Sequence, residues 1–279
     1  MKSPLPYHGG KNQLANRLWA IAQSRPHLHR VEPFAGGLSF TLATEPEGYS
    51  EVVNDLHGGI ANFWSVLRDP VQFEHMKRIL EATPFGHHAW DEEVIECLPH
   101  MRAAHLFVRC RMSMAGRMKD FTPLSRNRTR RGMNEQVSGW LTAIEGLPEV
   151  HNRLKRVVVL NRPALEVIQR EDGPNTLFYC DPPYLDTTRV SPLLYEYEMS
   201  AAEHETLLRS LLLLKGAFML SGYNSTLYTA YAGMGGWHRT DFDVAVHSGS
   251  GDTKRRAVEC LWTNFKPKIA ASESLSLAA

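Results

Sequence analysis

The chain alternates between short apolar runs and longer stretches whose apolar residues have helical spacing. The apolar runs end in turn-forming residues and are typical of strands buried on both faces of a parallel sheet. We predict strands over residues 29–34, 49–55, 156–160, 176–180, 216–220 and 257–262. Helices are predicted over residues 11–24 and 201–214, the second starting with a capping-box pattern made by Ser200 and Glu203. This alternation of strand and helix predicts a three-layer α/β domain.

The pattern changes between residues 60 and 153, where strand signals fade and helical stretches such as residues 100–118 dominate. Residues 101–131 hold nine of the chain's 31 basic residues but one of its 30 acidic residues. The rest of the chain is therefore net acidic, with 22 basic and 29 acidic residues. The alternative to a binding surface is that these charges belong to a solvent-exposed helix face and a polar loop, with no binding partner. However, residues 125–131 mix arginine with Ser, Asn and Thr, and these types contact phosphates and base edges. We therefore predict an inserted helical domain with a DNA-facing surface.

Length and composition are those of a folded protein of moderate size. The 279 residues correspond to about two domains, or to one domain with a large insertion. Hydrophobic residues make up 43% of the chain and charged residues 22%, which excludes disorder for most of it. The net charge of +1 excludes a protein that is basic all over, so contact with nucleic acid requires a local patch.

The cysteines and the termini indicate a cytoplasmic protein. The four cysteines are scattered without C-x-x-C spacing, which favours a reducing compartment and leaves a zinc knuckle unsupported. The histidines show no metal-ligand spacing, so we expect no metal. The longest apolar run, residues 211–214, is too short to span a membrane, and the N-terminus lacks the apolar core of a signal peptide.

The clearest chemical signal is the string Asp181-Pro182-Pro183-Tyr184 at the end of a predicted strand. Ligands of open α/β sheets bind beyond the carboxyl ends of the strands, and two prolines make a stiff turn there. The Asp181 carboxylate and the Pro182 carbonyl could accept both hydrogens of an exocyclic amine, while Tyr184 stacks on the base. This would expose the lone pair of a nitrogen that is otherwise a poor nucleophile. A proline-rich turn with a chance Asp and Tyr is the alternative.

A second signal is the segment Glu32-Pro33-Phe34-Ala35-Gly36-Gly37, in which a strand enters a tight glycine turn. Glycines let the backbone approach a nucleotide-type cofactor closely. Asp55 ends the next strand, 19 residues after Gly36, close to the spacing at which an acid meets ribose hydroxyls. Asp55 is equally suited to cap a helix. The string Tyr7-His8-Gly9-Gly10-Lys11 precedes a helix, but it lacks the spacing of a Walker A phosphate loop.

Together these strings resemble the Dam-type, alpha-group DNA adenine-N6 methyltransferases, from Pro6 to about Phe265. The resemblance implies a Rossmann-like methyltransferase sheet with an inserted, mainly helical target-recognition domain. It implies S-adenosylmethionine as the cofactor. Cofactor-binding residues would be Tyr7, Lys11, Phe34, Gly36, Gly37, Asp55 and Asp181. Catalytic residues would be Asp181, Pro182 and Tyr184. Residues 161–164 depart from the family, because they lack the acid that often lies near the cofactor's adenine.

The expected organisation has four segments. Residues 1–59 hold the cofactor-binding part, residues 60–153 the DNA target-recognition domain, residues 154–266 the catalytic part, and residues 267–279 a flexible tail. The expected partner is double-stranded DNA, bound by a monomer or weak dimer, with the target adenine swung out of the duplex. Candidate DNA contacts are Arg109, Arg117, Lys119, Arg126, Asn127, Arg128, Arg130 and Arg131.

Three alternatives remain open. The enzyme could methylate cytosine N4 or an RNA base, although such relatives more often carry Ser or Asn in place of Asp181. A DNA-binding relative that has lost catalysis is disfavoured by the intact Asp181, Pro182 and Tyr184. A dehydrogenase would need a Gly-x-Gly-x-x-Gly loop, which residues 36–39 do not provide. The recognition sequence and a role in restriction-modification are not determined by these residues.

Overall fold

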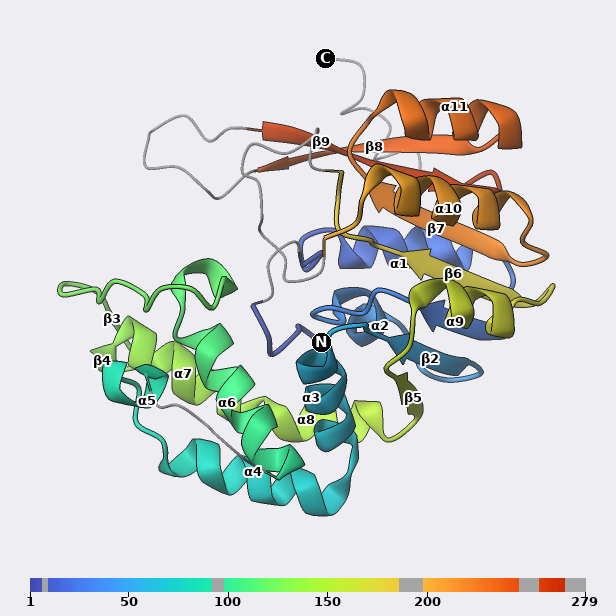
Figure 1. Ribbon diagram of the computed structural model, residues 1–279. Coiled ribbons are helices and arrows are strands. Elements are labelled where there is room, and N and C mark those ends of the chain that lie inside the picture. The colour runs from blue at the N-terminus through green and yellow to red at the C-terminus, as the bar shows by residue number, and fades with distance from the viewer. Residues whose placement is uncertain (7–9, 92–97, 186–197, 246–255, 269–279) are drawn as a thin grey trace. The chain divides into compact units, whose positions relative to one another are not determined.

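The computed structural model describes residues 1–6, 10–91, 98–185, 198–245 and 256–268, and its main feature is a mostly parallel seven-stranded sheet (Figure 1). The strands are β1 (His29–Glu32), β2 (Ser50–Asn54), β5 (Val157–Leu160), β6 (Thr176–Cys180), β7 (Ala217–Gly222), β8 (His238–Ala245) and β9 (Arg256–Thr263). β1 pairs in parallel with β2 and β6, and β6 with β7, whereas β9 is antiparallel to β7 and β8. All six predicted strands form, and the predicted Rossmann-like methyltransferase sheet is confirmed.

The strand order reverses at the middle of the sheet. The order is β5-β2-β1-β6-β7-β9-β8, so the chain moves outward from β1 through β2 to β5 on one side, and from β6 through β7 to the β9–β8 pair on the other. Ligands of open α/β sheets bind at the carboxyl ends of the strands where such a reversal occurs. The candidate motifs follow β1 and β6, which are the two strands that flank this point.

The strand β8 was not predicted, because its residues do not form an apolar run. Its buried residues Thr240 and Phe242 alternate with the exposed or half-buried Arg239, Asp241 and Asp243. This period of two is typical of an antiparallel strand with one wet face, and β8 lies at the edge of the sheet.

The chain divides into two compact units. The sheet unit comprises residues 16–34, 48–54 and 162–279, and the helical unit comprises residues 1–15, 35–47 and 55–161. Helices of the sheet unit are α1 (Ala15–Gln23), α9 (Ala164–Glu171), α10 (Ala201–Leu212) and α11 (Thr226–Gly235). In Figure 1, α9 and α10 lie in front of the strands and α1 lies behind them. The capping box of Ser200 and Glu203 at the start of α10 is confirmed.

The helical unit is built around stacked aromatic rings. Its helices are α2 (Ser39–Ala43), α3 (Gly58–Arg68), α4 (Pro70–Ala82), α5 (His87–Asp91), α6 (Pro99–Arg111), α7 (Glu135–Glu145) and α8 (Leu147–Leu154). Phe63 of α3 stacks on Phe107 of α6 with ring centroids 5.9 Å apart, and Phe107 meets Trp140 of α7 at 5.5 Å. All three rings are buried, so they join α3, α6 and α7 into one core.

The predicted helix over residues 100–118 is shorter than expected. The helix α6 ends at Arg111 and a short 3₁₀ helix, η1 (Met114–Gly116), follows it. The Ser113 hydroxyl donates to the Cys110 carbonyl at 3.0 Å, and Gly116 adopts a positive φ of 71°. A helix cannot continue through that backbone conformation, so the chain turns there.

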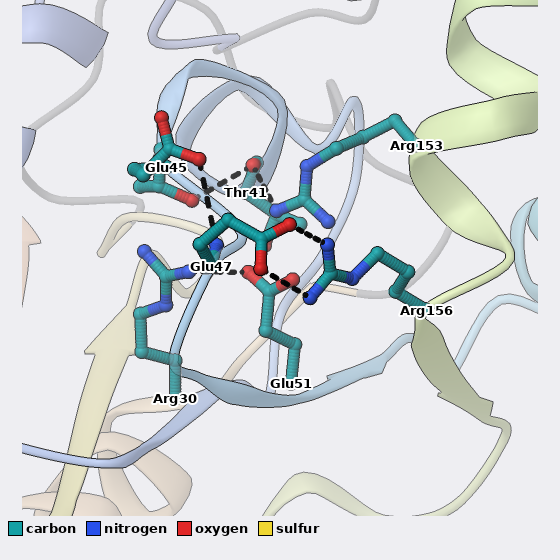
Figure 2. A network of polar contacts seen from close by, with 8 residues as sticks. Arg30, Thr41, Glu45, Glu47, Glu51, Arg153 and Arg156 are labelled. Atoms are coloured by element: carbon teal, nitrogen blue, oxygen red, sulfur yellow. Dashed lines mark hydrogen bonds and ion pairs between the residues drawn. The ribbon is translucent and has the colours of Figure 1, made fainter.

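A buried ion pair links the two strands that lead to the candidate site. Arg30 of β1 lies directly opposite Glu51 of β2, with a nitrogen–oxygen distance of 2.9 Å, and both are buried (Figure 2). The Arg30 guanidinium also lies 4.0 Å from the centre of the Tyr49 ring. A buried charge is costly without its partner, so this pair favours one register between β1 and β2. In the helical unit, Arg153 donates to the Thr41 carbonyl and Arg156 pairs with Glu47 (Figure 2).

Candidate active site

The carboxyl ends of β1 and β6 lie side by side where the strand order reverses. The two strands are parallel neighbours, with Val31 opposite Phe178. Phe34 follows β1 and Asp181 follows β6, so both come after the carboxyl ends of neighbouring parallel strands. The residues after these strands are the first candidates for a ligand site.

Asp181, Pro182 and Tyr184 occupy one short turn after β6. The Tyr184 hydroxyl oxygen lies 2.9 Å from Glu259 Oε1 and 3.2 Å from Asp181 Oδ1. Pro182 is buried, whereas Asp181 and Tyr184 are half-buried. The turn thus brings a carboxylate, a backbone carbonyl and an aromatic ring to the edge of the sheet.

Two further side chains, Tyr223 and Glu259, join this cluster and are not evident from the motifs. Tyr223 directly follows β7, and its ring lies 4.9 Å from the Tyr184 ring at an angle of 74°. Glu259 lies on β9 and is 7% exposed. Its sequence signal is an acid inside the otherwise apolar run of residues 257–262, because a buried carboxylate needs hydrogen-bond partners.

The hydroxyl of Tyr184 is held in its protonated form. The pKa of Tyr184 lies well above its usual value, first because burial disfavours the phenolate and then because Asp181 and Glu259 add negative charge nearby. Tyr184 therefore keeps a proton that it can donate to one of the two carboxylates beside it.

In the helical unit, the glycine turn after β1 is closed by the side chain of Asp55. Asp55 Oδ2 accepts the Gly36 N–H at 2.7 Å, and Asp55 Oδ1 accepts the His57 N–H at 2.8 Å. The Gly36 carbonyl accepts the indole N–H of Trp64 at 2.9 Å. Gly36 has a positive φ of 45°, which favours glycine at this position. Hydrogen bonds to the N–H and to the carbonyl of Gly36 therefore hold the turn in place.

Asp55 keeps acceptor capacity for a ligand. Each oxygen of an ionised carboxylate can accept two hydrogen bonds, and one bond to each is already formed by a backbone amide. Burial raises the pKa of Asp55, and the bonds from Gly36 and His57 partly oppose that rise. A desolvated carboxylate beside a glycine turn is suited to the two hydroxyls of a ribose. The helix beyond it is capped by His57, whose Nδ1 accepts from Gly59 and Ile60.

Two asparagines hold the loops after the strands. In the sheet unit, the fully buried Asn54 donates to the carbonyls of Pro33 and Arg162 and accepts the Arg162 N–H. In the helical unit, Asn161 donates to the carbonyls of Asp55 and Leu56 at 2.7 and 3.1 Å. The stretch that departs from the family therefore contacts the backbone of the candidate ribose-binding residue.

Other predicted cofactor residues have less definite positions relative to a ligand. Phe34 is half-buried and directly follows Pro33 at the end of β1. Lys11 is 6% exposed, and Gly37 is buried. Tyr7 lies outside the described residues. The cofactor roles of these four residues stay predictions.

The predicted DNA-binding residues differ in their surroundings. Lys119, Arg126, Asn127, Arg128, Arg130 and Arg131 are exposed, whereas Arg109 and Arg117 are half-buried. Arg109 lies 3.7 Å from the centre of the Trp90 ring and donates to the carbonyls of Trp90 and Met118. Its guanidinium therefore supports the fold of the helical unit. Contact of all eight residues with DNA stays a prediction.

The exposed arginines lie on or next to a short antiparallel hairpin, which we call the basic hairpin (residues 125–134). Its strands are β3 (Thr129–Arg130) and β4 (Met133–Asn134), joined by Arg131 and Gly132 with φ of 58° and 74°. Positive φ at both loop residues is the geometry of a type I′ turn. Arg131 anchors the turn to α7 through two bonds to Glu145 at 2.9 and 3.0 Å.

Among the described residues, no group of three or more His, Cys, Asp or Glu could hold a metal ion. Cys110, Cys180 and Cys260 are free thiols, and Cys97 lies outside the described residues. Burial raises the pKa of Cys110 to about 12 and that of Cys260 to about 11, so these thiols are protonated at neutral pH. None of the helices in the described ranges is long and apolar enough to cross a membrane.

Residues 7–94 match the family model of the D12 class N6 adenine-specific DNA methyltransferases. This match confirms the resemblance predicted from the motifs, and it supports DNA adenine methylation as the activity. The matched residues include Phe34, Gly36 and Asp55, and they end before Asp181. No curated protein matches the chain.

Proposed function

We propose that this relative of the D12 class N6 adenine-specific DNA methyltransferases transfers a methyl group from S-adenosylmethionine to the N6 amine of adenine in duplex DNA. The proposal rests on one observation above all. The carboxylate of Asp181 and the ring of Tyr184 stand after β6, at the point where the strand order reverses. The family match over residues 7–94 supports the same chemistry.

The glycine turn fits a nucleoside-type cofactor. Gly36 lets the backbone come close to a ligand, and Asp55 offers a desolvated carboxylate to ribose hydroxyls. When bound, S-adenosylmethionine supplies an electrophilic methyl group on a positively charged sulfur. Asp55 would hold the ribose, and the hydrogen bonds from Gly36 and His57 keep its carboxylate in one orientation.

Asp181 and Pro182 act on the target amine. The amine nitrogen would take the methyl group that the cofactor supplies when bound, and it would release one proton to solvent. Asp181 accepts a hydrogen bond from the amine throughout, and its charge stabilises the positive charge that develops on nitrogen. The Pro182 carbonyl accepts the other hydrogen, which favours a pyramidal nitrogen. Tyr184, set edge-on to Tyr223, provides an aromatic surface for the base.

The target base must leave the duplex before it can meet these groups, at a cost of about a few kcal/mol. Contacts between arginines and phosphates offset that cost. We assign these contacts to the basic hairpin, within the predicted target-recognition domain over residues 60–153. Gln136 holds the start of the hairpin by accepting the Ser125 N–H at 2.8 Å, and Asn134 donates to the Ser125 carbonyl at 2.7 Å. The exposed arginines are thus presented on an ordered segment.

Arg126→Ala and Arg128→Ala are each expected to weaken DNA binding. Each should also reduce the magnitude of the negative slope of the log association constant against log salt concentration by about 1. The reason is that each lost phosphate contact releases one fewer counterion. The measurement is a salt titration of affinity for one duplex. Arg170→Ala in α9 is the matched control, because Arg170 is an exposed arginine with a carboxylate partner, Glu166. An unchanged slope for both hairpin variants would remove this segment from the interface.

The proposed function is tested by incubating the protein with a random-sequence duplex pool and labelled S-adenosylmethionine, followed by mapping of the modified bases. We expect label on adenine N6 in a defined sequence context. Label on cytosine N4, or on an RNA pool in preference to DNA, would assign the activity to a different amino-methyltransferase class. DNA binding without any label would identify a catalytically silent relative.

A further inference from the structure

The proposed function leaves the buried carboxylate of Glu259 without a role. Glu259 lies on β9 opposite Phe242 of β8, and the next residue, Cys260, pairs with Gly222 of β7. Its backbone is therefore held by strands on both sides. Its Oε1 lies 2.9 Å from the Tyr184 hydroxyl, across 75 residues of sequence. The sheet thus places a rigid acceptor beside the turn that carries Asp181.

The Tyr184 hydroxyl has two carboxylates within reach and a single proton to donate. Hydrogen bonds between hydroxyl and oxygen acceptors have heavy-atom distances of about 2.5–3.0 Å. The distance to Glu259 Oε1 falls within that range, whereas the 3.2 Å to Asp181 Oδ1 exceeds it. The geometry therefore favours donation to Glu259. The raised pKa of Tyr184 keeps the proton on the hydroxyl, so the choice between acceptors is real.

The choice matters for Asp181. If Tyr184 donated to Asp181, that bond would occupy acceptor capacity and reduce the negative charge available to the amine. Donation to Glu259 spares Asp181 this bond, and Asp181 accepts the amine hydrogen in the proposed reaction. It also fixes the Tyr184 ring, which lies 4.9 Å from the Tyr223 ring.

We propose that Glu259 is a positioning residue for methyl transfer, which accepts the hydrogen bond from the Tyr184 hydroxyl and so spares the Asp181 carboxylate that bond when it acts on the target amine. This inference rests on the proposed function. It predicts an effect on the chemical step that depends on the Tyr184 hydroxyl, rather than a general effect on folding or on cofactor binding.

The test is a double-mutant cycle with Glu259→Ala and Tyr184→Phe. Glu259→Ala is expected to lower kcat by about tenfold, with KM for the cofactor unchanged, because Tyr184 then donates to Asp181. In the Tyr184→Phe background there is no hydroxyl to redirect, so the same change is expected to lower kcat by less than about twofold. Glu259→Gln keeps an acceptor oxygen at this position, and we expect it to recover most of the loss.

The control pair is Glu205→Ala with Tyr231→Phe, since Glu205 of α10 accepts the Tyr231 hydroxyl at 3.2 Å away from this sheet edge. That pair should show no coupling in kcat. An equal loss of kcat from Glu259→Ala in both Tyr184 backgrounds, or a rise in cofactor KM that accounts for the loss, would overturn the inference. A wild-type protein that methylates no nucleic acid would instead contradict the proposed function.

Discussion

Asp181→Ala is expected to lower the rate of methyl transfer by about 1,000-fold or more while leaving DNA binding largely intact. A carboxylate that accepts a hydrogen from the reacting amine contributes about 100- to 10,000-fold to such a step. The variant also loses the negative charge beside the nitrogen that becomes positive. The measurement is single-turnover transfer of label at saturating cofactor, together with the affinity for the same duplex.

Asp241→Ala is the control for that experiment. Asp241 lies on β8 in the sheet unit and pairs with Arg239 at 2.6 Å, so its loss also removes a carboxylate from the sheet. Because Asp241 has no assigned role in the reaction, its substitution should change the rate by less than about threefold, as for an ordinary surface ion pair. Full activity in Asp181→Ala would refute the role assigned to Asp181.

Asp55→Ala is expected to weaken binding of S-adenosylmethionine by about 100-fold or more. Hydrogen bonds to a charged group contribute about 1.5–3 kcal/mol each, and a ribose offers two hydroxyls to this carboxylate. The substitution also leaves the Gly36 and His57 amides without their acceptor. Isothermal titration of cofactor into the protein measures the loss.

The pH dependence of cofactor binding follows from the raised pKa of Asp55. Only the ionised carboxylate is a strong acceptor, so affinity should rise with pH through this pKa and then become constant. The pKa of Asp55 lies above the ordinary value of an aspartate. As the pH is lowered, affinity should therefore begin to fall at a higher pH than it would if Asp55 were exposed. Asp55→Asn should bind more weakly and show no such dependence.

Asp69→Asn is the matched control for Asp55. Asp69 also accepts two backbone amides, those of Val71 and Gln72, but it caps α4 in an exposed position. Asparagine caps helices about as well as aspartate, so this variant should keep both fold and cofactor affinity. Wild-type affinity in both Asp55 variants would show that the cofactor does not use this carboxylate.

Six of the seven strands of the sheet could be predicted, the antiparallel β9 among them, because strands inside a sheet are buried and form apolar runs. That signal is local, and it located all six predicted strands to within about two residues, which is the usual precision of element boundaries. β8 has no apolar run because one of its faces is exposed to solvent. The basic hairpin lacks the signal because two-residue strands are too short to show a period.

The basic cluster shows where counting charges is insufficient. Arg109 and Arg126 contribute equally to the excess of positive charge in residues 101–131. In the fold, the Arg109 guanidinium lies against Trp90 and donates to two carbonyls, whereas Arg126 is exposed. Burial separates a structural arginine from one that is available to phosphates, and burial depends on packing.

Asp181, Pro182 and Tyr184 lie within four consecutive residues. Their types and order alone therefore indicate a site for an amine. The spacing of Gly36 and Asp55 likewise follows from two consecutive strands and the turn between them. Glu259 and Tyr223 reach Tyr184 only because β7 and β9 pair beyond β6. Contacts between residues far apart in sequence are set by strand order and register, which no local pattern encodes, and those contacts bring the Glu259 carboxylate within 2.9 Å of the Tyr184 hydroxyl.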